Sequence, residues 1–80
     1  MDRITENRIL IDKIDEQIME LLDERFNLSI VIGQLKEQHK VAVLDGNRER
    51  EILNKASKYS HCPSIENIYK CIMTESKKLQ

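Results

Sequence analysis

The sequence contains few residues that interrupt helices, with only one proline and two glycines among its 80 residues. The proline is Pro63 and the glycines are Gly33 and Gly46. Proline removes a backbone hydrogen-bond donor, and glycine costs about 1 kcal/mol relative to alanine inside a helix. This scarcity permits a long helix in the N-terminal half, in which Gly33 is the only weak helix former.

The sequence also lacks a surplus of basic residues and lacks long apolar runs. Lys and Arg together number 13 and Asp and Glu 14, which gives a net charge of −1. A nucleic-acid binder needs excess positive charge to neutralise phosphates, so nucleic acid is not an expected partner. No run of 18 apolar residues occurs, and the first five residues do not resemble a signal peptide. We therefore expect no membrane partner and a cytoplasmic location.

Cysteine is scarce as well, with Cys62 and Cys71 as the only two. A predicted helix begins near Cys62, which separates the two α-carbons by roughly 13 Å. A disulfide requires α-carbons within about 7 Å, so we predict none within the chain. Together with His39 and His61, the cysteines do not show the spacing of metal ligands, and we predict no metal site.

Apolar residues recur at alternating intervals of three and four from Ile4 to about Lys40. This period is typical of an amphipathic helix with a coiled-coil seam. About 36 residues would make a helix roughly 54 Å long, whereas a compact domain of this size has a diameter near ~30 Å. A single chain cannot cover such a rod, so we predict a partner, most simply a second copy. The seam consists of Ile4, Ile11, Ile14, Ile18, Leu21, Leu28, Ile32 and Leu35.

The remaining sequence predicts two shorter helices. Asp2 or Thr5 would cap the first helix, and the apolar run 41–44 is too short for a helix, so we interpret it as a packed linker. Asp45 is a plausible N-cap of a second helix that ends at about residues 57–59. Pro63 fits the first turn of a third helix. The predicted fold is all-α, with three helices, one of them very long, in a single domain over residues 1–80.

Polar residues interrupt the apolar faces at a few positions. Arg25 occupies a seam position of the long helix, Arg48 and Glu49 lie on the inner side of the second, and Ser76 and Gln80 lie on one side of the third. Structural explanations exist for each: an arginine can extend to solvent, a charged first turn can form ion pairs, and serine can bond to a helix carbonyl. Their occurrence together favours a binding site.

Lysine and arginine residues on the long helix share one face. Lys36 follows Arg25 by 11 residues, a net rotation of ~20° and a separation of about 16 Å, so the two can hold a small dianion. Arg8 has nearly the same phase but lies some 25 Å from Arg25. If an antiparallel partner crosses near Ile18, residue 8 of one chain lies level with residue 28 of the other. A symmetric dimer would then contain two cationic pockets, each completed by Arg8 of the partner subunit.

The ordered polar positions resemble the all-helical (type II) chorismate mutases. The similarity covers the long helix and the start of the second, and resumes on the third. It implies an intertwined homodimer that converts chorismate to prephenate in the phenylalanine and tyrosine branch of aromatic amino-acid biosynthesis. The residues that carry it are Ile14-Asp15-Glu16, Leu21-Leu22, Glu24-Arg25, Val31-Ile32-Gly33, Lys36, Asp45, Arg48-Glu49-Arg50-Glu51, Ile72, Glu75-Ser76 and Gln80.

The resemblance also implies roles for these residues. Arg8 of the partner subunit and Arg25 would each bind a substrate carboxylate. Lys36 would contact the ether oxygen and a carboxylate, Gln80 would donate to the same ether oxygen, and Glu49 would accept from the ring hydroxyl. Asp45, Arg48 and Ser76 would complete the pocket.

The implied reaction is an intramolecular pericyclic rearrangement, so we expect no cofactor, metal, nucleophile or general base. Binding would hold the dianion in its reactive conformer. Negative charge builds on the ether oxygen in the transition state, where a fixed ammonium group and amide donor stabilise it.

Three alternatives remain open at the level of sequence. An isochorismate–pyruvate lyase shares the fold and the cationic pocket, although Glu49 opposite a ring hydroxyl favours the mutase. A metabolite-sensing dimer module would keep Arg25 and Lys36 but has no need of Glu49 and Gln80. A plain antiparallel coiled-coil adaptor is the third alternative.

Overall fold

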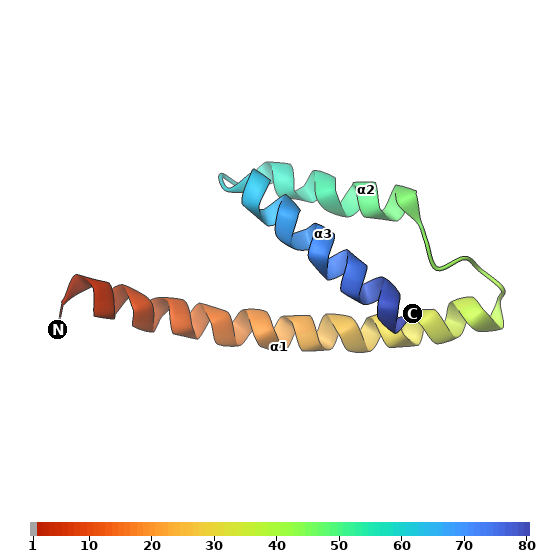
Figure 1. Cartoon of the computed structure of the whole chain (residues 1–80), viewed down its shortest axis with the longest axis horizontal. Coiled ribbons are helices and arrows are strands. Elements are labelled where there is room, and N and C mark those ends of the chain that lie inside the picture. Colours follow the sequence, from red (N-terminus) through yellow and green to blue (C-terminus); the bar gives the residue numbers. More distant parts are fainter. Residues whose placement is uncertain (1) are drawn as a thin grey trace.

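The computed structural model describes residues 2–80, which form three α-helices and one short 3-10 helix (Figure 1). This architecture confirms the prediction of an all-α fold with a long first helix. The elements are α1 (Arg3–Gln38), α2 (Gly46–Lys55), η1 (Ala56–Lys58) and α3 (Cys62–Leu79).

Helix α1 begins at a side-chain cap. The carboxylate of Asp2 accepts hydrogen bonds from the backbone N–H of Thr5 at 2.7 Å and from its hydroxyl at 3.1 Å. Asp2, one of the two predicted candidates, is therefore the N-cap. The hydrogen bond from the Thr5 N–H favours the ionised carboxylate and lowers the pKa of Asp2 below its usual value of 3.8.

Helix α1 ends in a Schellman motif. Lys40 has a positive φ of 54°, and its N–H donates to the carbonyl of Glu37 at 3.3 Å. The N–H of Val41 donates to the carbonyl of Lys36 at 2.8 Å. These two bonds satisfy carbonyls in the last turn of the helix, and the left-handed residue redirects the chain away from the helix axis.

The predicted packed linker is only partly correct. Residues 41–44 contain no regular structure, but Val41 and Leu44 remain 55% and 64% exposed. The apolar side chains of this segment are therefore not buried within one chain. Its hydrogen bonds to α1 are made by its backbone: besides the Val41 N–H, the carbonyl of Val43 accepts from Nζ of Lys36 at 2.8 Å.

The start and end of α2 and the start of α3 follow the predicted pattern. The side chain of Asp45 accepts from the backbone N–H of Arg48 at 3.1 Å and caps α2, as predicted. Helix α2 itself ends at Lys55, and η1 continues it over the predicted end region. Pro63 lies in the first turn of α3, where a missing N–H leaves no helical bond unmade.

Helix α3 packs against both α1 and α2 and so joins the other two helices (Figure 1). The N-terminal part of α1 extends well beyond α2 and α3 (Figure 1). The chain measures 56 × 24 × 15 Å with a radius of gyration of 16.0 Å, compared with about 12 Å for a compact domain of this size. Among residues 2–80, the buried apolar side chains are Ala56 and Met73.

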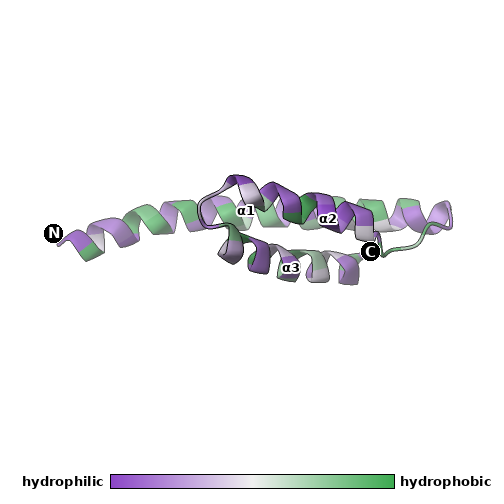
Figure 2. Cartoon of the chain, turned by 90° about the horizontal axis from the view of Figure 1, so that it is seen from above, coloured by the Kyte–Doolittle hydropathy of each residue, from purple (hydrophilic) through white to green (hydrophobic). Residues whose placement is uncertain are grey.

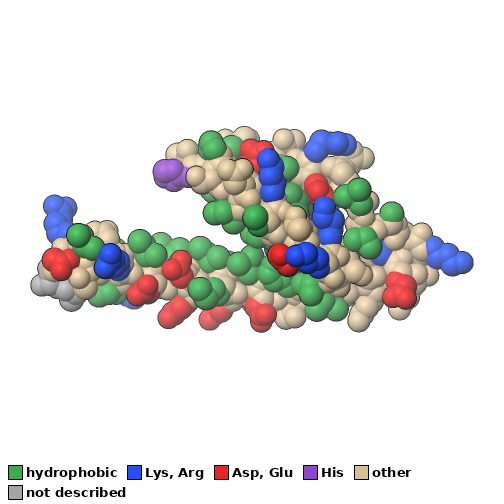
Figure 3. Space-filling view, in the orientation of Figure 1, with side chains coloured by type: hydrophobic (Ala, Val, Ile, Leu, Met, Phe, Trp, Pro, Cys, Tyr) green, Lys and Arg blue, Asp and Glu red, His purple; other side chains and the backbone are tan. Residues whose placement is uncertain are grey.

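The apolar seam of α1 therefore remains uncovered within one chain. All eight predicted seam residues are between 44% and 66% exposed. Apolar and polar residues alternate along the whole of α1 (Figure 2). In the space-filling view, hydrophobic side chains line the edge of α1 that faces α2 and α3, and acidic side chains gather on the opposite edge (Figure 3). Among residues 2–80, no helix combines the length and the apolar character needed to cross a membrane.

Candidate functional site

A cavity of about 390 Å³ lies between α1, α2 and the end of α3. Seven of the eight predicted site residues line it, so the fold brings together side chains from three helices and the linker. Apolar residues of all three helices form the rest of the wall. The seven are Arg25, Lys36, Asp45, Arg48, Glu49, Ser76 and Gln80.

Lys36 is held from two sides. Its Nζ donates to the carbonyl of Val43 at 2.8 Å and to Oε1 of Gln80 at 3.1 Å. An ammonium group has three protons, so one remains for a ligand. Because lysine only donates, the oxygen of the Gln80 amide must face Lys36 and its NH₂ group lies on the other side. The pair therefore presents two adjacent types of donor to the cavity.

Arg25 extends from α1 to α3 and is partly buried. Its guanidinium donates to Oγ of Ser76, which is buried in the wall. The structural explanation open at the sequence level was a bond from Ser76 back to its own helix, but the contact that the hydroxyl makes among residues 2–80 is with Arg25. Ser29 makes that type of bond instead, to the carbonyl of Arg25 at 3.1 Å. The contact fixes the arginine head group while leaving other N–H groups free to bind a carboxylate.

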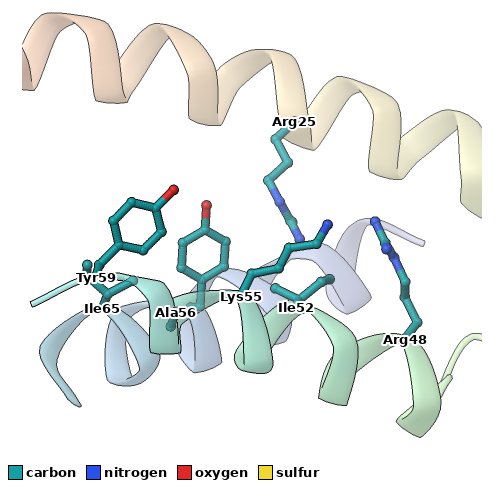
Figure 4. A pocket seen from close by; sticks show the side chains of 8 residues that line it. Arg25, Arg48, Ile52, Lys55, Ala56, Tyr59 and Ile65 are labelled. Atoms are coloured by element: carbon teal, nitrogen blue, oxygen red, sulfur yellow. The ribbon is translucent and has the colours of Figure 1, made fainter. Parts of the chain in front are cut away.

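The opposite wall is formed by the first turn of α2. Arg48 points from α2 toward α1, while Arg25 points from α1 toward the other two helices and reaches Ser76 of α3 (Figure 4). Arg48 also pairs with Glu51 at 3.2 Å on the exposed side of the helix. Glu49 turns away from that surface pair and contacts Lys77 of α3 at 3.3 Å.

Lys77 is a site residue that sequence reasoning missed. It lines the same cavity and follows Ser76 directly in α3. The predicted cluster was built from cations on the long helix, and a lysine in the last turn of another helix is otherwise typical of a solvated helix end. Lys77 follows Met73, which is buried in the structure, by four residues and so lies on the same face of α3.

A second hollow of about 280 Å³ adjoins the cavity and shares Arg25, Arg48 and Ile52 with it. Tyr59 of the connection after η1 points from this hollow toward α1 (Figure 4). The two hollows therefore adjoin each other, with Arg25 and Arg48 in the wall of both.

Arg8 does not line either hollow. It lies exposed on the N-terminal part of α1, 17 residues before Arg25 and hence about 25 Å away. A single chain does not bring Arg8 to the cavity, in agreement with the helix geometry used to place it. Its contribution from a second copy stays a prediction.

Comparisons with known proteins point to the same family as the residues that line the cavity. A family model described as chorismate mutase type II matches residues 7–80. The chain belongs to the chorismate mutase type II family. It is 42% identical over 55 residues to a bifunctional chorismate mutase/prephenate dehydratase of Aquifex aeolicus, a match that covers 69% of this chain and 15% of that protein. It is 26% identical over 85 residues to a chorismate mutase of Methanocaldococcus jannaschii, covering 100% of this chain and 86% of the relative.

A solved structure has the same fold. A conserved hypothetical protein from Pyrococcus furiosus superimposes with a TM-score of 0.87 at 30% sequence identity. The match covers 99% of this chain and 96% of the other. The long first helix and the path of α3 across it are therefore shared by a protein of nearly the same length.

Proposed function

We propose that this chain is a chorismate mutase that rearranges chorismate to prephenate, acting as a homodimer. Membership of the family supports the reaction, and the seven lining residues supply the groups that the reaction needs. The single observation that carries the proposal is the Lys36–Gln80 hydrogen bond of 3.1 Å. It joins an ammonium and an amide so that both can donate to one ligand oxygen.

In this mechanism the protein folds the substrate and stabilises its charge. The guanidinium of Arg25, held by Ser76, binds one carboxylate of the dianion with two parallel hydrogen bonds. The carboxylate of Glu49 accepts a hydrogen bond from the ring hydroxyl of the substrate. These contacts keep the side chain of the substrate over its ring, which removes much of the entropic part of the barrier.

In the transition state the carbon–oxygen bond of the ether lengthens, and negative charge builds on the ether oxygen. The remaining proton of Lys36 and the NH₂ of Gln80 donate to that oxygen. Both donors are fixed before the reaction. The ammonium group of Lys36 donates to the carbonyl of Val43 and to the amide oxygen of Gln80, and the second of these bonds also holds the Gln80 amide. Donors that need no reorganisation stabilise the transition state more than the ground state.

The proposed dimer is intertwined and antiparallel along α1. Its support is the exposed apolar seam of α1, which is too long for one chain to cover, and the position of Arg8 outside the cavity. Arg8 of the partner subunit would bind the second carboxylate. A cytoplasmic location remains a prediction from the sequence.

The proposal is tested by incubating the purified protein with chorismate, following the loss of chorismate absorbance and identifying the product. Formation of prephenate supports it. Isochorismate is tested in parallel, and its conversion to salicylate and pyruvate in preference to mutase turnover would make the protein a lyase. Tight chorismate binding without turnover would instead indicate a sensing module.

A further inference from the structure

Glu49 and Lys77 form an ion pair that joins two helices. The Nζ of Lys77 lies 3.3 Å from Oε2 of Glu49, and the side chains are 37% and 28% exposed, respectively. The other three ion pairs among residues 2–80 each join residues three or four apart on one helix. Their side chains are more exposed than those of Glu49 and Lys77. The Glu49–Lys77 pair thus connects the start of α2 to the end of α3.

Each partner also occupies the helix end that favours its charge. Glu49 lies in the first turn of α2, where the helix dipole stabilises an anion. Lys77 lies in the last turn of α3, where the dipole stabilises a cation. The local structure therefore favours the place of each charge, in addition to the attraction between the two groups.

The pair is part of the cavity wall. Lys77 forms its ion pair with Oε2 of Glu49, so the second carboxylate oxygen, Oε1, can accept a hydrogen bond from the hydroxyl of a ligand. The lysine also changes the charge of the site. The lining contains four cationic side chains and two carboxylates, a surplus of two positive charges. Without Lys77 the surplus from this chain would be one, so the lysine supplies one of the positive charges that face a dianion.

We propose that Lys77 is a positioning residue that fixes the Glu49 carboxylate for the ring hydroxyl of the substrate. The proposal rests on the proposed function, since it assigns the hydroxyl of chorismate to Glu49. Lys77 acts through Glu49 and need not touch the substrate. Its removal leaves the carboxylate mobile and turned toward Arg48 or solvent, so the substrate ring is held less well.

The test is a double-mutant cycle with Glu49→Gln and Lys77→Met. Methionine keeps an unbranched apolar chain in place of the lysine stem, so packing is largely preserved. We expect Lys77→Met to lower kcat/KM for chorismate by about tenfold, the scale of a lost hydrogen bond to a charged group. Combined with Glu49→Gln, it should cause little further loss. Lys77→Arg should restore most of the activity.

The matched control is Lys78→Met. Lys78 is the next residue, pairs with Glu75 at 3.0 Å on the exposed side of α3, and does not line the cavity. Its replacement should leave kcat/KM unchanged. Equal effects of Lys77→Met and Lys78→Met, or additive effects in the cycle, would overturn the positioning role.

Calorimetric titration with prephenate, which keeps the ring hydroxyl and is not consumed by the proposed reaction, gives the same cycle in dissociation constants. It keeps the two proposals separate, because it does not depend on turnover. A wild-type protein that binds chorismate without forming prephenate overturns the proposed function, while coupling between residues 49 and 77 in binding still supports the role of Lys77. Absence of coupling in an active enzyme overturns the role of Lys77 alone.

Discussion

Gln80 packs directly on Gly33, at a distance that leaves room for no side chain. A Cβ placed on Gly33 would lie 2.5 Å from Cα of Gln80 and 2.8 Å from its carbonyl oxygen. The contacted atoms are backbone, so no rotamer change relieves the overlap. Gly33 lies one turn before Lys36 on α1, and the same approach brings the Gln80 amide to the ammonium group. The glycine therefore sets the geometry of the two donors.

Gly33→Ala should lower activity more than stability. The methyl group forces the last residue of α3 away from α1 and separates Gln80 from Lys36. Alanine also raises helix propensity by about 1 kcal/mol, which offsets part of the packing loss. We expect kcat to fall at least about tenfold, toward the value of Gln80→Ala, because a transition-state donor is displaced. Steady-state kinetics and thermal unfolding of the variants measure both effects.

Gly46→Ala is the control for this experiment. A Cβ at Gly46 meets only the end of the Arg50 side chain, at 3.9 Å, which is an ordinary contact. This variant should keep the activity of the wild type and gain a little stability from helix propensity. Loss of activity in Gly46→Ala, or full activity in Gly33→Ala, would contradict the assigned role of the close approach.

Removal of the central cations should abolish most turnover without unfolding the protein. Lys36→Ala deletes a donor to the ether oxygen, which typically costs a factor of about 10²–10³ in kcat. Arg25→Ala removes a carboxylate contact, so the loss should be of similar size in kcat/KM. Lys70→Ala, which removes only an exposed surface pair, should be close to wild type. Circular dichroism before the assay checks that each variant is folded.

The sequence was sufficient to predict features that depend on local structure. The period of the seam predicted α1, Asp45 was correctly placed as a helix cap, and Asp2 was one of the two candidates for the cap of α1, because caps and amphipathic faces depend on residues within one or two turns. The phases of Arg25 and Lys36 along one helix were predictable for the same reason. Both side chains do line one cavity.

Features that depend on how the helices cross were harder to predict from the sequence. Gly33 was visible only as a weak helix former, since its contact with Gln80 exists only once α3 has been placed. Lys77 was missed because its partner Glu49 lies 28 residues earlier. The linker was expected to be packed, yet Leu44 is 64% exposed, since an apolar run of four residues has no period that specifies a buried face.

Lys40→Gly should stabilise the protein. Lys40 is a non-glycine residue with a positive φ of 54°, a conformation that costs an L-residue roughly 1–2 kcal/mol. Glycine adopts it without strain and is the preferred residue at this position of a Schellman motif. We expect a gain of about 1 kcal/mol in the free energy of unfolding, less than the full strain because glycine also increases the entropy of the unfolded chain. Urea unfolding measures the change, and an unchanged or lower midpoint would contradict it.

Two inactive variants should complement each other if Arg8 crosses the interface. Arg8→Ala removes the arginine that a chain gives to its partner, and Lys36→Ala removes the lysine that it keeps. In a mixed dimer, the Arg8→Ala chain retains its own Lys36 and receives Arg8 of the partner subunit, so one site is complete and the other lacks both groups. Random exchange of subunits places half of the chains in mixed dimers, which restores about one quarter of wild-type activity.

The subunits are mixed, unfolded in urea and refolded together, and kcat is measured per chain after the dimer mass has been confirmed by sedimentation. Arg25→Ala mixed with Lys36→Ala is the control, because both residues lie in the same half of the site and every mixed dimer has two defective sites. Recovery of activity with Arg8→Ala but not with Arg25→Ala would assign Arg8 to the neighbouring site. Equal, low activity in both mixtures would place Arg8 in the same half of the site as Arg25, because the exchange of subunits would then have supplied nothing that each chain lacked. An Arg8→Ala protein that is fully active on its own would place Arg8 outside the active site.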